Sequence, residues 1–241
     1  MIAQMEADLA ELEAVKDARR FFHATYLRTT RAVADEIARG GFADPDWVDA
    51  WDVAFAGLYL DALGADRRGE PVSGPWRVAF DTAFARTDLR PLNHVLYGLN
   101  AHINFDLPQA LLAVIPPEDF DDPVVLARRE ADHTHVDRVL QARVGAEDDE
   151  LTAVSRVSLL DRLLRPANRA ASRRFLAEAR AKVWRNTRVL DQARRAGDAE
   201  YDRARADLEH LCAHRVRDLT RPGPVLLRLA RRGFGVLLPG A

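Results

Sequence analysis

Apolar residues recur every three to four positions along most of the chain, whereas the alternation of every second position that marks strands is nearly absent. A period of three to four favours amphipathic α-helices. The first such segment runs from about Glu6 to Arg39, with a break expected near Lys16. The pattern therefore predicts an all-α protein.

Further helices follow from their start and stop signals. Asp44 is a good N-cap and Pro45 suits the first helical position, so a helix should begin there. The remaining ranges are expected to be 45–63, 76–86, 89–115, 123–144 and, beyond an acidic linker at 145–150, two or three helices within 151–219, including a long one at 167–196. We predict a single-domain multi-helix bundle over 1–220 with a kinked central helix. Residues 221–241 are expected to form a basic amphipathic tail docked on it.

Polar residues gather in the otherwise apolar central segment 89–115. His94, Gly98, His102 and Asp106 are spaced four apart and climb one side of a helix. His102 and Asp106 are one turn apart, so an imidazole nitrogen and a carboxylate oxygen could hold one cation. His94 lies two turns away, roughly 12 Å along the axis, and would bind substrate or a second ion.

Pro108 should interrupt this helix, because proline lacks the N–H and crowds the carbonyl four residues back, here Asn104. A free backbone acceptor would then lie beside Asp106. Asn100 and Asn104 are poor helix formers, and we expect them to bond to nearby backbone or to position ligands. The structural alternative is that His102 and Asp106 simply pair at a buried kink.

A third ligand is expected from another helix. Asp132 falls on the apolar stripe of Val125 and Val136, and a buried carboxylate must be paired. We predict a metal site of His102, Asp106 and Asp132 that holds a divalent ion, zinc or iron. His94 and Asp132 are the candidate catalytic groups.

Other acidic and histidine motifs fit a site less well. Asp52 or Asp61 could face it from the helix at 45–63. The pair His210 and His214 has metal-ligand spacing but lies among arginines, which disfavour a cation, so it should lie outside the main site. Glu130 and His133 make a single ExxH, and a di-iron bundle needs two such pairs and two more glutamates. The sequence contains no HExxH, GxSxG, P-loop or GxGxxG.

Composition narrows the class of protein. The 241 residues are 48% hydrophobic with a net charge of −2, which suits one domain with a core and disfavours a nucleic-acid binder. Cys212 is the single cysteine, and no signal-type or membrane-spanning run is apparent. We expect a cytoplasmic protein without stable membrane insertion. The expected partner is a small-molecule substrate, and a homodimer is left open.

The stretch "HVLYGLNAHINFDLPQAL" resembles the signature of an uncharacterised helical family, a domain of unknown function found mainly in GC-rich bacteria. The family pattern H–x₇–H–x₃–D matches His94, His102 and Asp106, and its D–F–x–x–V–N block matches Asp132 but has an aromatic residue where this chain has His133. The resemblance implies a site at these residues and no particular reaction. The layout is also loosely similar to helical zinc-dependent phospholipases and nucleases.

Two classes of function remain. The first is a metal-dependent enzyme, hydrolase or lyase, acting on a small molecule in a helical pocket. Its enzymatic alternatives are a metal-free acid–base isomerase or cyclase of small-molecule biosynthesis and a di-iron oxygenase. The second class is a non-catalytic binding or scaffold protein, in which the polar central helix would fix helix register.

Overall fold

The computed structural model describes the backbone of residues 1–154 and 159–240. Within these ranges it also describes the side chains, except those of residue 137 and of residues 140–176. The elements are α1 (Ile2–Ala14), α2 (Arg20–Ala38), α3 (Pro45–Arg67), α4 (Gly74–Ala85), α5 (Pro91–Ala101), the π-helix η1 (His102–Asp106), α6 (Leu107–Val114), α7 (Pro117–Asp121), α8 (Pro123–Val154), α9 (Leu159–Ala196), α10 (Asp198–Thr220) and α11 (Val225–Arg232). No β-strand occurs within the described ranges, which confirms the all-α prediction. Over the same ranges, no helix has the length and apolarity to cross a membrane.

Two of the predicted boundaries, at Lys16 and at Asp44, are correct. Lys16 has a positive φ of 56°, which helical residues do not adopt, and it separates α1 from α2. The Asp44 side chain accepts a hydrogen bond from Trp47 N (3.2 Å), and Pro45 opens α3. Local sequence therefore decides where these helices begin and end.

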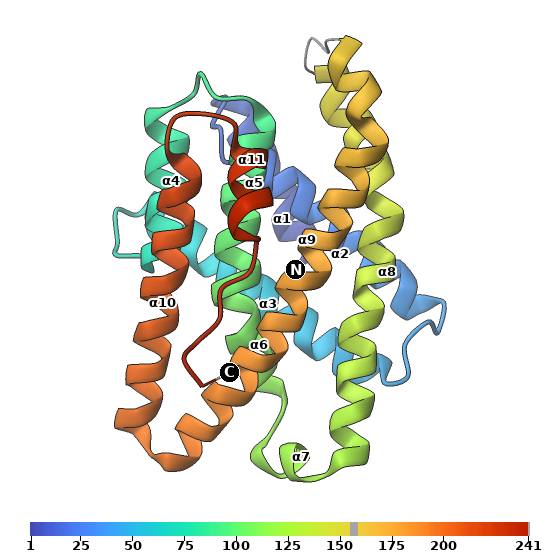
Figure 1. The fold of residues 1–241 in the computed structure, drawn as a ribbon, viewed down its shortest axis with the longest axis vertical. Helices are drawn as coiled ribbons and strands as arrows, with labels where there is room; N and C mark the ends of the chain where they lie inside the picture. The colour runs from blue at the N-terminus through green and yellow to red at the C-terminus, as the bar shows by residue number, and fades with distance from the viewer. Residues whose placement is uncertain (155–158, 241) are drawn as a thin grey trace.

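The acidic linker predicted at 145–150 is wrong. The helix α8 continues through these residues to Val154. The run contains one alanine and two glutamates, which are good helix formers, and no proline, so its single glycine does not end the helix. The hairpin of α8 and α9 rises above the rest of the bundle in Figure 1.

The central rod consists of α5, η1 and α6, and the helices α2, α3, α4, α9 and α10 pack around it (Figure 1). All five residues of η1 are buried. The rod therefore places its polar side chains in the interior, where each must find a partner or remain unpaired.

The chain after α10 returns across this rod. After α11, residues 233–240 run down between α9 and α10 in front of α5 and α6, drawn in red in Figure 1. Phe234, Val236 and Leu238 are buried, and Arg231 and Arg232 stay exposed.

Candidate acid–base site in the central rod

The interruption expected at Pro108 lies just before it, as the π-helix η1. The Leu107 N–H bonds to the carbonyl of His102, five residues back, instead of the usual four. Pro108 has no N–H to offer Asn104, so widening the turn here costs less than in a continuous α-helix. π-Turns of this kind often occur at functional sites. The widened turn holds both His102 and Asp106.

His102 and Asp106 form a buried pair. Their Nδ1 and Oδ2 atoms lie 2.8 Å apart, and the two residues are 1% and 2% exposed. Trp76 from α4 donates its indole N–H to the same Oδ2, also at 2.8 Å. An indole nitrogen can only donate, so Oδ2 acts as an acceptor, and the simplest network places a proton on Nδ1 of His102. The partner Trp76 could not be read from sequence, although a buried tryptophan generally needs one.

The other imidazole nitrogen is unpaired. His102 Nε2 is buried and has no hydrogen-bond partner among the described residues. Burial lowers the pKa of His102 despite the adjacent carboxylate, so the ring is neutral near pH 7. Burial also raises the pKa of Asp106, against hydrogen bonds from His102 and Trp76 that favour its charged form. With the proton on Nδ1, Nε2 presents a lone pair, as a general base requires.

Aromatic rings enclose this imidazole. Phe55 lies parallel to it, with ring centroids 3.6 Å apart, and Tyr26 meets it edge-on at 4.4 Å. Three further rings lie at centroid distances of 5.9 Å, those of Phe22, Tyr59 and Trp76. The cage excludes water, which strengthens electrostatic interactions at the pair.

Tyr26 and Asp52 add two more titratable groups. The Tyr26 hydroxyl is buried, and Thr30 is its hydrogen-bonding neighbour. Its pKa is raised well above the ordinary value, first by burial and then by the charge of Asp52, with a smaller effect of Asp106. Burial and the nearby Asp49 raise the pKa of Asp52 to about 7. Asp52, which the sequence offered as one of two candidates on its helix, therefore titrates near neutral pH.

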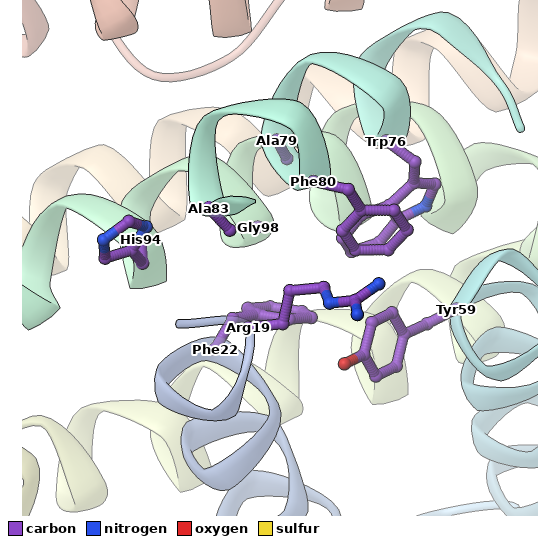
Figure 2. A pocket seen from close by; sticks show the side chains of 9 residues that line it. All are labelled: Arg19, Phe22, Tyr59, Trp76, Ala79, Phe80, Ala83, His94 and Gly98. Atoms are coloured by element: carbon purple, nitrogen blue, oxygen red, sulfur yellow. The ribbon is translucent and has the colours of Figure 1, made fainter. Parts of the chain in front are cut away.

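His94 lies at the edge of a separate pocket. The enclosed space of this pocket is about 10 Å³, room for about one water molecule, and Arg19 crosses it between the rings (Figure 2). The pKa of His94 is lowered by burial and by Arg20, while the backbone of Arg86 acts in the opposite direction. Gly98 lines the same pocket. A Cβ at this position would lie 2.3 Å from the Phe22 ring, so the glycine allows α2 to pack closely against α5.

The pocket and the cage share a wall. Phe22, Tyr59 and Trp76 line the pocket and are also ring neighbours of His102. Trp76 and Tyr59 lie at one end of the pocket in Figure 2, above and below Arg19, and His94 lies at the other end. One layer of rings thus separates the pocket from the His102–Asp106 pair.

Asp132 does not join this pair. Its two carboxylate oxygens accept hydrogen bonds from the backbone N–H groups of Ala43 and Asp44, both at 2.8 Å. The carboxylate is buried and paired, as its position on the apolar stripe required, but its partners are at the start of α3. Throughout the described residues, no group of three or more His, Cys, Asp or Glu side chains is placed to hold a metal ion. The three-residue metal site is therefore not assembled in this structure.

The remaining histidines have structural or surface positions. His23 is buried and joins Tyr59 Oη (2.9 Å) to the Met5 carbonyl (2.7 Å). His133 is buried beside the rings of Trp51 and Trp184 and forms no pair with Glu130, which lies on the surface side of the helix. The pair of histidines on α10 is exposed, in agreement with its predicted place outside the main site.

Comparison with known proteins identifies the family. A family model described as a family of unknown function (DUF5995) matches residues 1–222, so the chain belongs to this family. Neither the comparison with curated proteins nor that with solved structures gives a match.

Proposed function

We propose that this member of the DUF5995 family is a small-molecule enzyme of the isomerase or cyclase type that uses His102 as a general base without a metal ion. One observation carries the proposal. His102 has one nitrogen held by Asp106, and the other is buried, neutral and unpaired. Most buried polar atoms have a hydrogen-bond partner, and a catalytic role is one reason for an atom without one. An imidazole held in this way is prepared to accept a proton.

A metal-dependent hydrolase or lyase has less support from the side chains present. Asp106 Oδ2 already accepts two N–H groups, and both oxygens of Asp132 are engaged by backbone. His102 Nε2 is the one donor atom of the predicted set without such a partner in the described structure. The residues present therefore do not fit an ion held by His102, Asp106 and Asp132.

In the proposed reaction, His102 Nε2 removes a proton from a C–H or O–H group of the substrate. Asp106 then stabilises the imidazolium that forms, through the 2.8 Å hydrogen bond to Nδ1. A positioned general base typically contributes about 10²- to 10⁴-fold to the rate. Asp52, with its pKa raised to about 7, can return a proton at neutral pH. The same histidine and carboxyl group could serve isomerisation or cyclisation.

The substrate would approach from the pocket that His94 borders. Phe22, Tyr59 and Trp76 form the wall between this pocket and His102, and displacement of one ring would open the way. The His94 ring is neutral, and because the backbone carbonyl of Arg86 is within reach of one ring nitrogen, the other nitrogen can accept a hydrogen bond from a ligand. These contacts favour an uncharged, largely apolar molecule with one polar end.

The test combines a tautomer measurement with a ligand screen. In protein labelled with ¹⁵N-histidine, the proposal expects His102 to be neutral at pH 7.5 with the proton on Nδ1, and His102→Gln identifies its signal. A library of small uncharged metabolites is then screened by thermal shift, and each hit is checked for a shift of the His102 Nε2 resonance and for product formation. His102→Gln should lower turnover about 100-fold or more.

Two controls separate the outcomes. His214→Gln changes an exposed histidine on α10 and should leave ligand binding and turnover unchanged. Asp106→Asn should keep the fold but release the His102 tautomer, because the amide presents one acceptor and one donor. Stoichiometric metal bound through His102 in the purified protein would instead support a metal-dependent hydrolase or lyase. A proton on Nε2, or the absence of any hit that reaches His102, would favour a scaffold role for the pair.

A further inference from the structure

Two asparagines of the central rod, Asn100 and Asn104, bind the end of the chain. Asn104 donates from Nδ2 to the carbonyl of Phe234 (3.1 Å) and accepts from the N–H of Val236 (3.3 Å). Asn186 of α9 donates to the carbonyl of Val236 (3.1 Å) and accepts from the N–H of Leu238 (2.9 Å). Two asparagine amides thus bind successive alternate residues, much as a neighbouring strand would.

Charged and amide groups extend this recognition at Phe234 and Gly235. Glu178 accepts from the N–H groups of both residues, at 3.0 and 3.4 Å. Lys182 donates to the Gly235 carbonyl at 3.2 Å, and Asn100 donates to the Phe234 carbonyl at 3.0 Å. All of these bonds join a side chain to backbone, so they recognise an extended chain rather than particular side chains.

The apolar side chains of the segment point to the same side. Phe234, Val236 and Leu238 are buried, whereas Leu237 is 37% exposed. Val236 and Leu238 belong to a cluster that also contains Phe105, Leu112, Leu190, Leu208 and Cys212. A Cβ on Gly235 would lie 3.0 Å from the backbone Cα of Ala179, so the segment needs glycine at this point. The groove therefore selects the pattern Phe-Gly-Val-x-Leu.

Residues 234–238 contact the helical domain through its side chains and not through backbone–backbone hydrogen bonds. Among the described residues, the last such bond along the chain joins Gly233 N to Leu229 O, at the end of α11. The family match ends at residue 222, before the segment, but includes every residue that binds it: Asn100, Asn104, Glu178, Lys182 and Asn186. The groove belongs to the family domain, and its occupant lies outside the matched region.

We propose that the groove between α9 and the central rod is a peptide-binding site, and that its ligand is the chain's own segment 234–238, bound reversibly. Because the tether keeps this ligand at a high effective concentration, the groove is filled in the intact chain. Asn104 lies within η1, so release of the segment would leave an unpaired amide in the turn that holds His102 and Asp106. Occupancy of the groove is thereby connected to the geometry of that turn. The peptide site itself does not depend on the proposed reaction.

The experiment cuts the connection in the full chain. A protease site is inserted between Pro222 and Gly223, which are exposed residues between α10 and α11. After cleavage, the peptide 223–241 should stay bound during gel filtration and exchange with a fluorescent synthetic copy in a polarisation assay. Aggregation on cleavage, or retention of the original peptide without exchange, would show that the segment is a permanent part of the core and would overturn the proposal.

Variants of the synthetic peptide test recognition without altering the domain. Val236→Asp places a charge in the buried cluster and should weaken binding at least about tenfold. Leu237→Ser changes the exposed residue and is the matched control, with binding expected within about twofold of the parent. Equal binding of the two variants would contradict a site that reads alternate positions.

Hydrogen exchange on the uncut protein gives an independent measurement. If the segment leaves the groove reversibly, the amides of Val236 and Leu238 exchange through local opening, faster than those of α5 and η1. Protection equal to that of the central rod would contradict reversible binding.

Discussion

Phe55 and His102 lie face to face, with ring centroids 3.6 Å apart and planes inclined by 4°. They come from α3 and from the π-turn of the central rod. Phe55 itself is partly exposed, whereas His102 is 1% exposed, so the phenyl ring forms part of the layer between the imidazole and solvent. Burial of His102 depends in part on this one side chain.

Replacing Phe55 with leucine should therefore raise the pKa of His102 toward its ordinary value. Burial is the main cause of the lowered pKa, and a branched aliphatic side chain cannot cover the imidazole face as a parallel ring does. An NMR titration of the His102 ring measures the change. Phe84→Leu is the control, because Phe84 is 90% exposed. An unchanged His102 pKa in the Phe55 variant would mean that other rings keep the imidazole desolvated.

Asp132→Asn should destabilise the fold without altering His102. The carboxylate accepts two backbone N–H groups at the start of α3, and an amide would direct its own NH₂ at one of them. The expected loss is roughly 1–3 kcal/mol in the free energy of unfolding, measured by urea denaturation. Asp202→Asn, on an exposed face of α10, should have little effect. A shift of the His102 resonances in the Asp132 variant would show that Asp132 acts at the pair after all.

Gly98→Ala should destabilise the protein through a clash with α2. The added Cβ would lie 2.3 Å from Cγ of Phe22, and overpacking of this kind typically costs about 1–3 kcal/mol. Phe22→Leu in the same chain should recover part of the loss, so the two changes are not additive in denaturation experiments. Gly57→Ala is the matched control: no atom lies within 4 Å of its added Cβ, and alanine there should stabilise α3 by about 0.5–1 kcal/mol. Equal effects of the two alanines would exclude the clash.

His133→Phe should reduce the loss of stability in acid. Burial and the nearby Arg180 hold the pKa of His133 well below its ordinary value, so the folded state keeps this ring neutral. The unfolded state binds a proton below its pKa of about 6.5, and stability therefore falls as the pH drops through that value. Between pH 7.5 and 5.5, the variant should lose about 1 kcal/mol less than the parent in the free energy of unfolding.

The control for this measurement is His214→Phe, which changes an exposed histidine and should keep the parent's pH dependence. The raised pKa of Asp52 acts in the opposite direction, because its folded state holds a proton up to about pH 7 that the unfolded state releases. That contribution is the same in parent and variants, so it cancels in the comparison. A steeper acid loss in His133→Phe would show that His133 is protonated in the folded protein.

Local sequence determined the fold class, several helix boundaries and the pairing of His102 with Asp106. The helical period predicts an all-α chain, Lys16 separates the first two helices, and Asp44 caps α3. His102 and Asp106 meet because residues four apart lie on one helix face, and the spacing survives the π-turn before Pro108. Each of these features depends on neighbours within a few residues, which a sequence displays directly.

Tertiary structure decided the partners of the buried polar groups. The apolar stripe around Asp132 required that the carboxylate be paired, but the backbone that pairs it lies 88 and 89 residues away. Asn104 contacts the segment at Phe234, and Trp76 is 30 residues from Asp106. Periodicity indicates that a side chain is buried, because burial follows from the face it occupies. It does not identify the group that meets it, because that depends on how distant helices pack in space.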